Sequence, residues 1–280
     1  MSEVEAFYDK NAQYEWERLE RHRMEFAVTL RALKDYLPPA PAKILDAGGG
    51  PGRYAIALAQ LGYEVTLFDL SKNCLELAKQ KTQEAGAKIA SFEHGDARDL
   101  SRFADESFNA VLFMGPLYHL LTEEDRRRAL RETRRVLKAN GLLFASFITK
   151  YAVLRWAAKE EPDWIIKYSE RLEALLSLGT LHKRPDDPGF TSAYFAHPSE
   201  IKPLLESEGF ETLDLIACES LISMIEEKVN ELTGEAFDAW VELNYKLSRD
   251  PCLYGAAEHI LYVGRKRPRE ARYAHEKEST

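Results

Sequence analysis

Cysteine is scarce in this 280-residue chain and nowhere clustered. The three cysteines, Cys74, Cys218 and Cys252, are odd in number and far apart, so neither a disulfide framework nor a thiolate zinc site is expected. The seven histidines lack the i, i+3 or i, i+4 spacing beside carboxylates that a helical metal site needs. We therefore expect a protein of the reducing cytoplasm that binds no metal.

Long apolar runs and an excess of positive charge are also missing. No segment approaches the roughly 20 apolar residues that span a bilayer, and the acidic start of the chain lacks the apolar run of a signal peptide. The 38 basic and 46 acidic residues leave a net charge of −8, which repels phosphate backbones. The basic runs at 126–128 and 265–267 border expected element ends, where such runs are usually solvated. Membrane and nucleic acid are not expected as partners, and small molecules or peptides fit better.

The sequence contains enough apolar residues for a full core, and its expected helices and strands alternate regularly. A hydrophobic content of 45% suits one large α/β domain or a domain with an insertion. Periodicity predicts helices at 4–36 with a break, 54–61, 72–85 and 122–138, and strands at 43–47, 64–70, 89–93, 108–114, 142–148, 210–218 and 259–265. Strands that alternate with helices pair in parallel through right-handed crossovers, so we predict an open doubly wound sheet.

The alternation is interrupted twice after residue 150. These two aromatic-rich, helical stretches are expected to cap the carboxyl edge of the sheet, where open α/β folds bind ligands; the alternative is ordinary helical decoration. The predicted organisation is an N-terminal helical segment (1–37), a core (38–150 and 197–266), two cap insertions (151–196 and 221–256) and a flexible tail (267–280).

A glycine-rich turn follows the first expected strand and carries the main chemical signal. Its residues 48–52 read Gly-Gly-Gly-Pro-Gly, and such a turn lets backbone N–H groups at a helix start approach an anionic ligand. The turn alone does not separate a dinucleotide from S-adenosylmethionine, since residues 50–55 also match the G-x-G-x-x-[GA] spacing. Asp69, about 20 residues further on, suits a ribose diol. Asp96 and Ala97 follow the third strand and suit an adenine edge.

Taken together, these motifs resemble those of class I S-adenosylmethionine-dependent methyltransferases. The resemblance rests on the order and spacing of residues 44–52, 68–71, 95–97, 107–111 and 135–143, and covers roughly 40–150 and 197–266. It implies a Rossmann-like, doubly wound seven-stranded sheet whose last strand is antiparallel. Two departures, Asn109 for an aspartate and Asn140 for a proline or glycine, fall outside the expected cofactor contacts.

The resemblance also assigns residues to the cofactor S-adenosylmethionine. It implies that Asp46 orders the turn, that Gly48 and Gly50 line the methionine moiety, that Asp69 takes the ribose with Leu70 against adenine, and that Asp96 and Ala97 address the adenine edge. Met114 opens the segment that presents the methyl donor. The N-terminal helix is similar to one that folds across the cofactor, where Tyr8 and Tyr14 could bond the methionyl carboxylate and Arg18 or Arg23 could neutralise it.

The acceptor side is expected around Tyr118 and His119. His119 is the candidate general base, because its ordinary pKa lies near neutrality; the alternative is a histidine that only packs or bonds the backbone. Tyr194 and His197 are further substrate candidates. We therefore predict a monomeric or homodimeric methyltransferase that acts on a small-molecule N, O or S acceptor. The alternatives are an NAD(P)-dependent oxidoreductase, for which no Tyr-x-x-x-Lys follows the fourth strand, and a non-catalytic S-adenosylmethionine sensor or assembly subunit.

Overall fold

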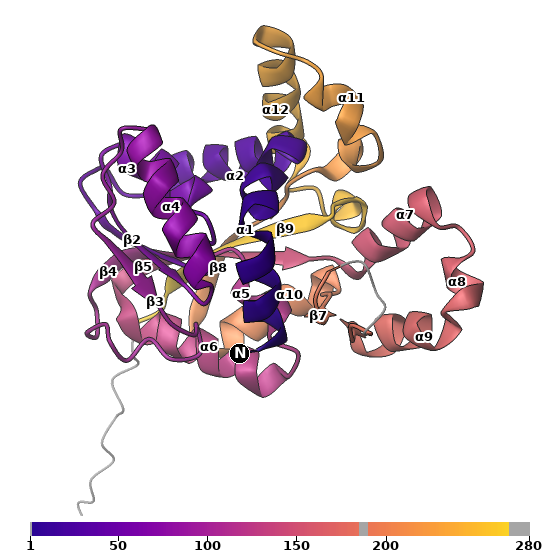
Figure 1. The fold of residues 1–280 in the computed structure, drawn as a ribbon, viewed down its shortest axis with the longest axis horizontal. Coiled ribbons are helices and arrows are strands. Elements are labelled where there is room, and N and C mark those ends of the chain that lie inside the picture. The colour runs from indigo at the N-terminus through magenta and orange to yellow at the C-terminus, as the bar shows by residue number, and fades with distance from the viewer. Residues whose placement is uncertain (1, 185–189, 269–280) are drawn as a thin grey trace, which may run out of the picture.

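A computed structural model describes residues 2–184 and 190–268. Its centre is a seven-stranded sheet in the order β3-β2-β1-β4-β5-β9-β8 (Figure 1). The strands are β1 (Lys43–Ala47), β2 (Glu64–Asp69), β3 (Ser91–His94), β4 (Phe108–Phe113), β5 (Leu137–Ile148), β8 (Phe210–Ala217) and β9 (His259–Lys266). The first five pair in parallel, and β9 runs antiparallel to both of its neighbours. The predicted doubly wound sheet with an antiparallel last strand is confirmed.

Helices cover both faces of this sheet, because successive strand side chains point to opposite faces. Ile44 belongs to the core beneath one helical layer and Leu45 to the core beneath the other, and both are fully buried. One layer holds α2 (Arg23–Tyr36), α3 (Arg53–Gln60), α4 (Lys72–Glu84) and α12 (Glu235–Leu247); the other holds α5 (Pro116–His119), α6 (Glu123–Val136) and α10 (Pro198–Ser207). The sheet edge between the layers is left for a ligand.

The helix boundaries agree with the sequence pattern except before β5. The expected break in the N-terminal helical segment falls at His22, between α1 (Glu3–Arg21) and α2. The helix expected to reach residue 138 ends at Val136, and β5 begins at Leu137 rather than 142. Leu137 pairs with Phe108 before an irregularity in which Asn140 takes a φ of +59°. Strand pairing with Phe108, 29 residues earlier in the chain, therefore overrides the helical pattern around Leu137.

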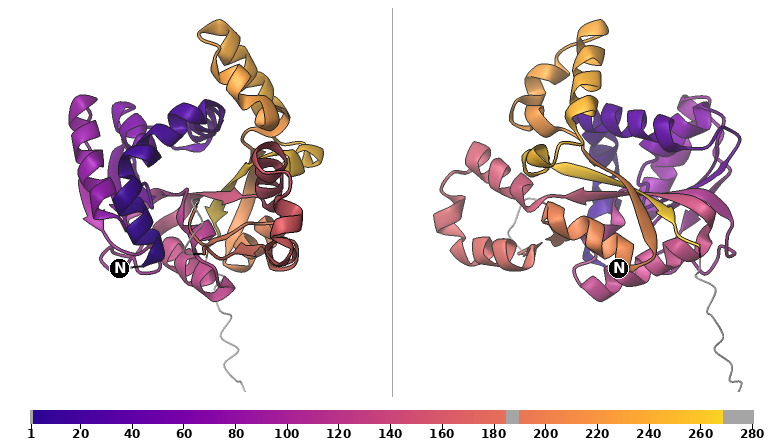
Figure 2. Two further views of the ribbon diagram at one scale, coloured as in Figure 1. Left: turned by 45° about the vertical axis from the view of Figure 1, so that its right-hand side comes forward. Right: turned by 180° about the vertical axis from the view of Figure 1, so that it is seen from behind.

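The two predicted insertions project from the sheet in different directions (Figure 2). The first contains α7 (Lys150–Glu160), α8 (Trp164–Lys167), α9 (Ser169–Leu178) and the short strands β6 (Thr180–Leu181) and β7 (Ala193–Tyr194); the second contains η1 (Ser220–Ile225), α11 (Glu226–Asn230), α12 and η2 (Pro251–Ala256). The first insertion has a core of its own around Trp164 and Leu175. Residues 185–189 of this insertion and residues 269–280 of the predicted flexible tail lie outside the described residues.

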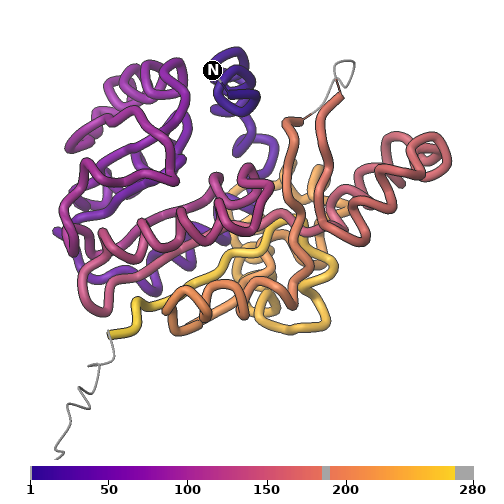
Figure 3. The backbone as a smooth tube through the Cα atoms, turned by 90° about the horizontal axis from the view of Figure 1, so that it is seen from below, coloured from indigo at the N-terminus to yellow at the C-terminus, as the bar shows by residue number. Residues whose placement is uncertain are grey.

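The N-terminal helix α1 stands at the same edge of the sheet as the β6–β7 pair, as the view from below shows (Figure 3). The Glu3 carboxylate accepts hydrogen bonds from the backbone N–H and hydroxyl of Ser192, at 2.5 and 2.9 Å. Phe7 packs edge-on against Phe190, with ring centroids 5.9 Å apart. Two segments almost 190 residues apart thus meet at this edge. None of the described helices is both long and apolar enough to cross a membrane.

Candidate active site

The glycine turn between β1 and α3 is packed tightly on the side that faces the protein. Gly48 and Gly49 donate their N–H groups to the Phe68 carbonyl oxygen, at 2.7 and 3.4 Å. Gly48 has a φ of +78°, and a Cβ placed there would lie 2.6 Å from the Pro116 side chain. At Gly50, by contrast, the nearest atom to an added Cβ is 3.9 Å away. The turn is closed toward the protein and open on its outer side.

A cavity of about 540 Å³ lies over this open side. All the residues that the sequence motifs assigned to the core of the cofactor site line it together. They are Asp46, Gly48, Gly50, Asp69, Leu70, Asp96, Ala97 and Met114. The parallel strands bring them to one edge, because β1, β2, β3 and β4 all end there.

Two buried carboxyl groups, Asp46 and Asp69, lie beside the turn. Asp69 Oδ2 accepts from the Gly50 N–H and Oδ1 from the Ser71 N–H, both at 2.7 Å. Burial still dominates and raises the pKa of Asp69 to about 6, although these two hydrogen bonds lower it. Neither oxygen of Asp46 makes a well-formed hydrogen bond. Burial, with the neighbouring Asp69 charge, raises the pKa of Asp46 to about 7.

Asp96 is held differently, by an arginine two residues away. Arg98 donates to it from its backbone N–H at 2.8 Å and from Nη2 at 2.6 Å, and its Nη1 reaches Asp125 at 3.3 Å. Half-burial opposes ionisation of Asp96, but Arg98 outweighs it and lowers the pKa of the carboxyl. Asp96 is therefore fully ionised at neutral pH. Asp69 is mostly ionised there, and Asp46 is about half protonated.

A relay of hydrogen bonds crosses the far end of the cavity through His119. Tyr8 Oη lies 2.8 Å from His119 Nε2, and Thr191 Oγ1 lies 3.0 Å from Nδ1. Because the Thr191 hydroxyl donates to the Ser192 carbonyl at 3.1 Å, it must accept from an Nδ1–H. Nε2 is then unprotonated and accepts from the Tyr8 hydroxyl. Burial lowers the pKa of His119 to about 3, so the ring is neutral throughout the physiological range.

The comparisons with known proteins agree with this geometry. Residues 44–141 match the family model described as a methyltransferase domain. The chain is 31% identical to a putative methyltransferase of Encephalitozoon cuniculi over 173 residues, which cover 60% of this chain and 75% of the relative. The chain belongs to the S-adenosylmethionine-dependent methyltransferase family.

Other relatives of this chain differ in acceptor. A glycine/sarcosine N-methyltransferase of Aphanothece halophytica is 32% identical over 145 residues (50% of this chain, 51% of the relative). A tRNA 5-carboxymethoxyuridine methyltransferase of Escherichia coli is 32% identical over 117 residues (41% and 44%). The chain thus spans about half the length of these curated relatives. The crystal structure of a possible histamine N-methyltransferase from Thermotoga maritima superposes with a TM-score of 0.59 at 19% identity, covering 95% of this chain and all of that one, which supports the fold.

The sequence predicted that four residues of the N-terminal helices contact the cofactor, namely Tyr8, Tyr14, Arg18 and Arg23. Of these, only Tyr8 and Arg18 line the cavity. Tyr14 lies six positions beyond Tyr8, on another face of α1; it is 58% exposed and stacks beneath Arg21 at 4.0 Å. Arg23 comes after the break at His22 and packs 4.1 Å from the Phe237 ring, where it donates to the Leu232 carbonyl. Neither Tyr14 nor Arg23 is placed to bind a ligand in the cavity.

Of the predicted substrate residues, likewise, some line the cavity and others lie outside it. Tyr118 and His119 line the cavity. Tyr194 lies outside it, with its hydroxyl donating to Glu200 at 2.8 Å and its ring 3.7 Å from the Arg126 guanidinium carbon. His197 is the N-cap of α10 and accepts from the Ser199 N–H at 3.2 Å. Both are held by local helix and strand contacts.

Several lining residues had no local signal in the sequence. Glu3, His182 and Ser192 line the cavity, as does Glu15, which accepts from Arg18 Nε at 3.0 Å. Glu15 lies seven positions beyond Tyr8, but α1 is kinked between them at Asn11, which has a φ of −117° and a ψ of 22°. Regular helical spacing therefore did not predict that both line the cavity. Of the two insertions, only the first contributes lining residues; none of those that line the cavity comes from 221–256. The second insertion packs on α2 instead.

The residues of the cavity fit S-adenosylmethionine. The turn has no space for a side chain at Gly48 and is open at Gly50, and the buried Asp46 carboxyl has unused hydrogen-bonding capacity beside it. Asp69 and Asp96 could accept from ribose hydroxyls and the adenine amino group. The Glu15–Arg18 ion pair offers opposite charges to an ammonium and a carboxylate on one ligand. These groups suit the ribose, the adenine edge and the charged methionine end of the cofactor.

Proposed function

We propose that this protein transfers a methyl group from S-adenosylmethionine to a small-molecule acceptor. The observation that carries the proposal is the continuity of the cavity: one hollow of about 540 Å³ joins the glycine turn and its carboxylates to an aromatic end at Tyr8, Tyr118 and His119. When bound, S-adenosylmethionine supplies an electrophilic methyl group on its sulfonium. The chain has to hold the acceptor in line with that group and exclude water.

The aromatic end is built for positioning. The rings of Tyr118 and Phe190 lie 4.7 and 5.2 Å from that of His119, and Tyr8 approaches it edge-on at 5.3 Å. Such rings contribute rigid apolar walls at little cost in conformational entropy. They would orient a small acceptor and keep water from it.

The state of His119 bears on the kind of acceptor. A pKa of about 3 makes the ring a weak base, and its Nε2 lone pair is already occupied by the Tyr8 hydroxyl. We therefore propose His119 as the residue that orients Tyr8 and the acceptor, in place of the general base expected from the sequence. This favours a neutral amine nitrogen or a thiolate, which need little proton removal, over a hydroxyl.

The net charge of −8 and the cover formed by α1 and residues 190–192 favour a small molecule over tRNA, although a relative that acts on tRNA makes this a question for experiment. We also propose a cytoplasmic protein, monomeric or homodimeric. The three free cysteines support that location, since Cys74 and Cys218 are buried and unpaired.

Binding and transfer can be tested separately. Calorimetry should show binding of S-adenosylmethionine and its demethylated product, S-adenosylhomocysteine, but not of NAD⁺. Asp69→Asn should weaken binding by about tenfold or more, since a hydrogen bond to a charged acceptor contributes about 1.5–3 kcal/mol. Asp99→Asn is the matched control, because Asp99 is exposed and outside the cavity. Absence of binding to the native protein would refute the proposal.

Transfer would be followed with methyl-labelled cofactor. Label should enter small-molecule fractions of a cell extract and not purified tRNA. Label found only in tRNA would overturn the acceptor class. Tight binding without transfer to either would identify a sensor or assembly subunit instead of an enzyme.

A further inference from the structure

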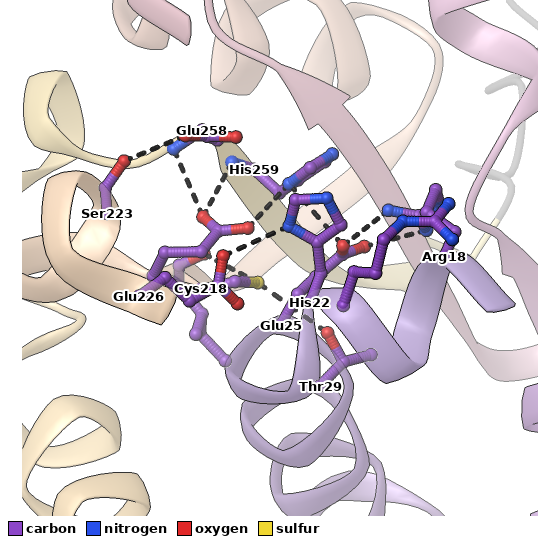
Figure 4. Close-up of polar contacts among 12 residues, drawn as sticks. Arg18, His22, Glu25, Thr29, Cys218, Ser223, Glu226, Glu258 and His259 are labelled. Atoms are coloured by element: carbon purple, nitrogen blue, oxygen red, sulfur yellow. Dashed lines mark hydrogen bonds and ion pairs between the residues drawn. The ribbon is translucent and has the colours of Figure 1, made fainter. Parts of the chain in front are cut away.

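A chain of buried charges leads from the cofactor cavity into the sheet behind it (Figure 4). Arg18 lines the cavity and donates from Nη1 and Nη2 to the two oxygens of Glu25, at 2.6 and 3.2 Å. On the other side of Glu25, His259 Nδ1 lies 3.7 Å from Oε2 and 2.6 Å from Glu219 Oε1. Glu219 Oε2 accepts from the backbone N–H groups of Glu258 and His259, at 3.1 and 2.9 Å.

This chain joins parts of the fold that are distant in sequence. Arg18 belongs to α1, which lines the cavity, and Glu25 belongs to α2. Glu219 follows β8, and His259 begins the antiparallel strand β9. Glu25 is 5% exposed and Glu219 is fully buried. Charges buried to this degree are costly unless each is paired, so removing one member leaves its neighbour uncompensated. The chain therefore attaches the N-terminal cover to the sheet with a defined geometry.

Arg18 is the end of the chain that a ligand can meet. A guanidinium has five N–H groups, and three are used here: Nε by Glu15 and one on each terminal nitrogen by Glu25. The two-point contact with Glu25 fixes the plane of the guanidinium. We propose that Glu25 is the positioning residue for Arg18, and that the charges of His259 and Glu219 behind it set the affinity of the cavity for its cofactor. This inference rests on the proposed function.

The protonation of His259 determines the net charge of this group of ion pairs. Burial opposes protonation, but Glu25 and Glu219 outweigh burial and raise the pKa of His259 to about 9. Burial likewise opposes ionisation of Glu25, yet Arg18 and then His259 lower the pKa of Glu25 to about 2. The other titratable or charged groups that interact with Glu25 or His259 are His22, Tyr54, Tyr118, Cys218 and Glu258. Arg155 and Glu226 lie one interaction further away, beside Glu258 and Glu219 and beside His22.

Loss of the His259 proton would leave Glu25 and Glu219 with one positive partner fewer. The potential at Arg18 then becomes more negative, which disfavours a carboxylate bound there. A unit charge about 10 Å away, at an effective dielectric constant of about 20, changes an affinity by roughly tenfold. By linkage, the bound ligand should raise the pKa of His259 by about one unit in return.

A divalent cation is the other occupant that this geometry allows, because ligand atoms of Glu25, Glu219 and His259 all lie within 4.8 Å of one another. Each of these groups already has a partner. Arg18 and protonated His259 supply the positive charge that an ion would bring. The arrangement is thus complete as an ion-pair chain.

The test measures S-adenosylhomocysteine affinity by calorimetry between pH 7 and 10 for the native protein, His259→Gln and His197→Gln. Over this range the affinity of the native protein should fall by roughly tenfold more than that of His259→Gln, which lacks the titrating group. The amino group of the ligand titrates in the same range, and comparison of the two proteins at each pH removes that contribution. His197→Gln is the matched control, because His197 caps α10 outside the cavity and its contacts are with Ser199 and Tyr151; it should keep the native fall.

Two further measurements apply if His259→Gln does not fold. Histidine NMR on the native protein should place the His259 pKa near 9 and raise it when S-adenosylhomocysteine is added. Glu219→Gln retains an acceptor for the backbone N–H groups but loses the charge, so the fall in affinity should move to lower pH. Native and His259→Gln affinities with the same pH dependence, or a His259 pKa unmoved by ligand, would overturn the inference alone. Absence of binding at every pH would overturn both it and the proposed function.

Discussion

Replacing Asp46 with asparagine should stabilise the ligand-free protein at neutral and alkaline pH while weakening cofactor binding. The Asp46 carboxyl is 1% exposed, and neither oxygen makes a well-formed hydrogen bond. Burial, with the Asp69 charge, raises its pKa from 3.8 to about 7. At about 1.4 kcal/mol for each pKa unit, this shift corresponds to about 4 kcal/mol of destabilisation once the group is ionised in both states.

The direction of this pH effect on stability follows from how many protons the folded and unfolded states bind. Between about pH 4 and pH 7 the folded protein keeps a proton on Asp46 that the unfolded chain has released. The free energy of unfolding therefore falls as pH rises through this window and stays low above it. Asparagine does not titrate, so the variant lacks this fall. Asp69, with its pKa raised to about 6, contributes a fall of the same sign to both proteins.

The assay is urea unfolding followed by circular dichroism at pH 4 to 9. The stability difference between Asp46→Asn and native protein should change by up to about 4 kcal/mol in favour of the variant between pH 4 and pH 8. Asp99→Asn, at an exposed position, should show no such trend. Calorimetry should show weaker binding of S-adenosylhomocysteine to Asp46→Asn, because the ligand loses a buried carboxyl group that lines the cavity and whose oxygens have no other partner. A stability difference independent of pH would refute the reasoning.

Two further outcomes follow from the cavity. Gly48→Ala should destabilise the protein by about 2–4 kcal/mol and abolish cofactor binding, since its Cβ would lie 2.6 Å from Pro116 at a φ of +78°. Gly86→Ala has a φ of +60° but nothing within 4 Å, so in thermal unfolding it should cost about 1–2 kcal/mol and leave binding unchanged. His119→Ala should lower kcat/KM without changing the shape of its pH profile between pH 5 and 8, because burial lowers the pKa of His119 to about 3; loss of an ionisation in this range would restore His119 as the base.

The part of the site nearest the sheet could be predicted because its determinants are local. Gly48 to Gly52 must follow a strand and begin a helix, Asp69 is the last residue of β2, and Asp96 lies two residues beyond β3. Once strands alternate with helices, parallel pairing brings all their carboxyl ends to one edge. Motif spacing therefore predicted which residues meet, without any knowledge of side-chain contacts.

Predictions beyond the core motifs were less accurate, since they concerned side chains whose placement depends on packing. Tyr8 and Tyr14 are both tyrosines of one helix, and only the pitch and seating of α1 turn Tyr8 inward and leave Tyr14 exposed. Tyr194 and His197 lie in a promising aromatic segment but make local contacts with Glu200 and Ser199. Thr191, in the same segment, is the residue that reaches His119.

Hydrophobic periodicity and turn chemistry act over a few residues, so the class of fold, the glycine turn and the carboxylates around it could be predicted from the order of amino acids. The protonation of the groups involved depends on the folded arrangement. The pKa of His119 is lowered by enclosure, and that of His259 is raised by Glu25 and Glu219, which lie 234 and 40 positions away along the chain. Burial and Coulomb interactions depend on distance in space, and the order of residues does not specify that distance.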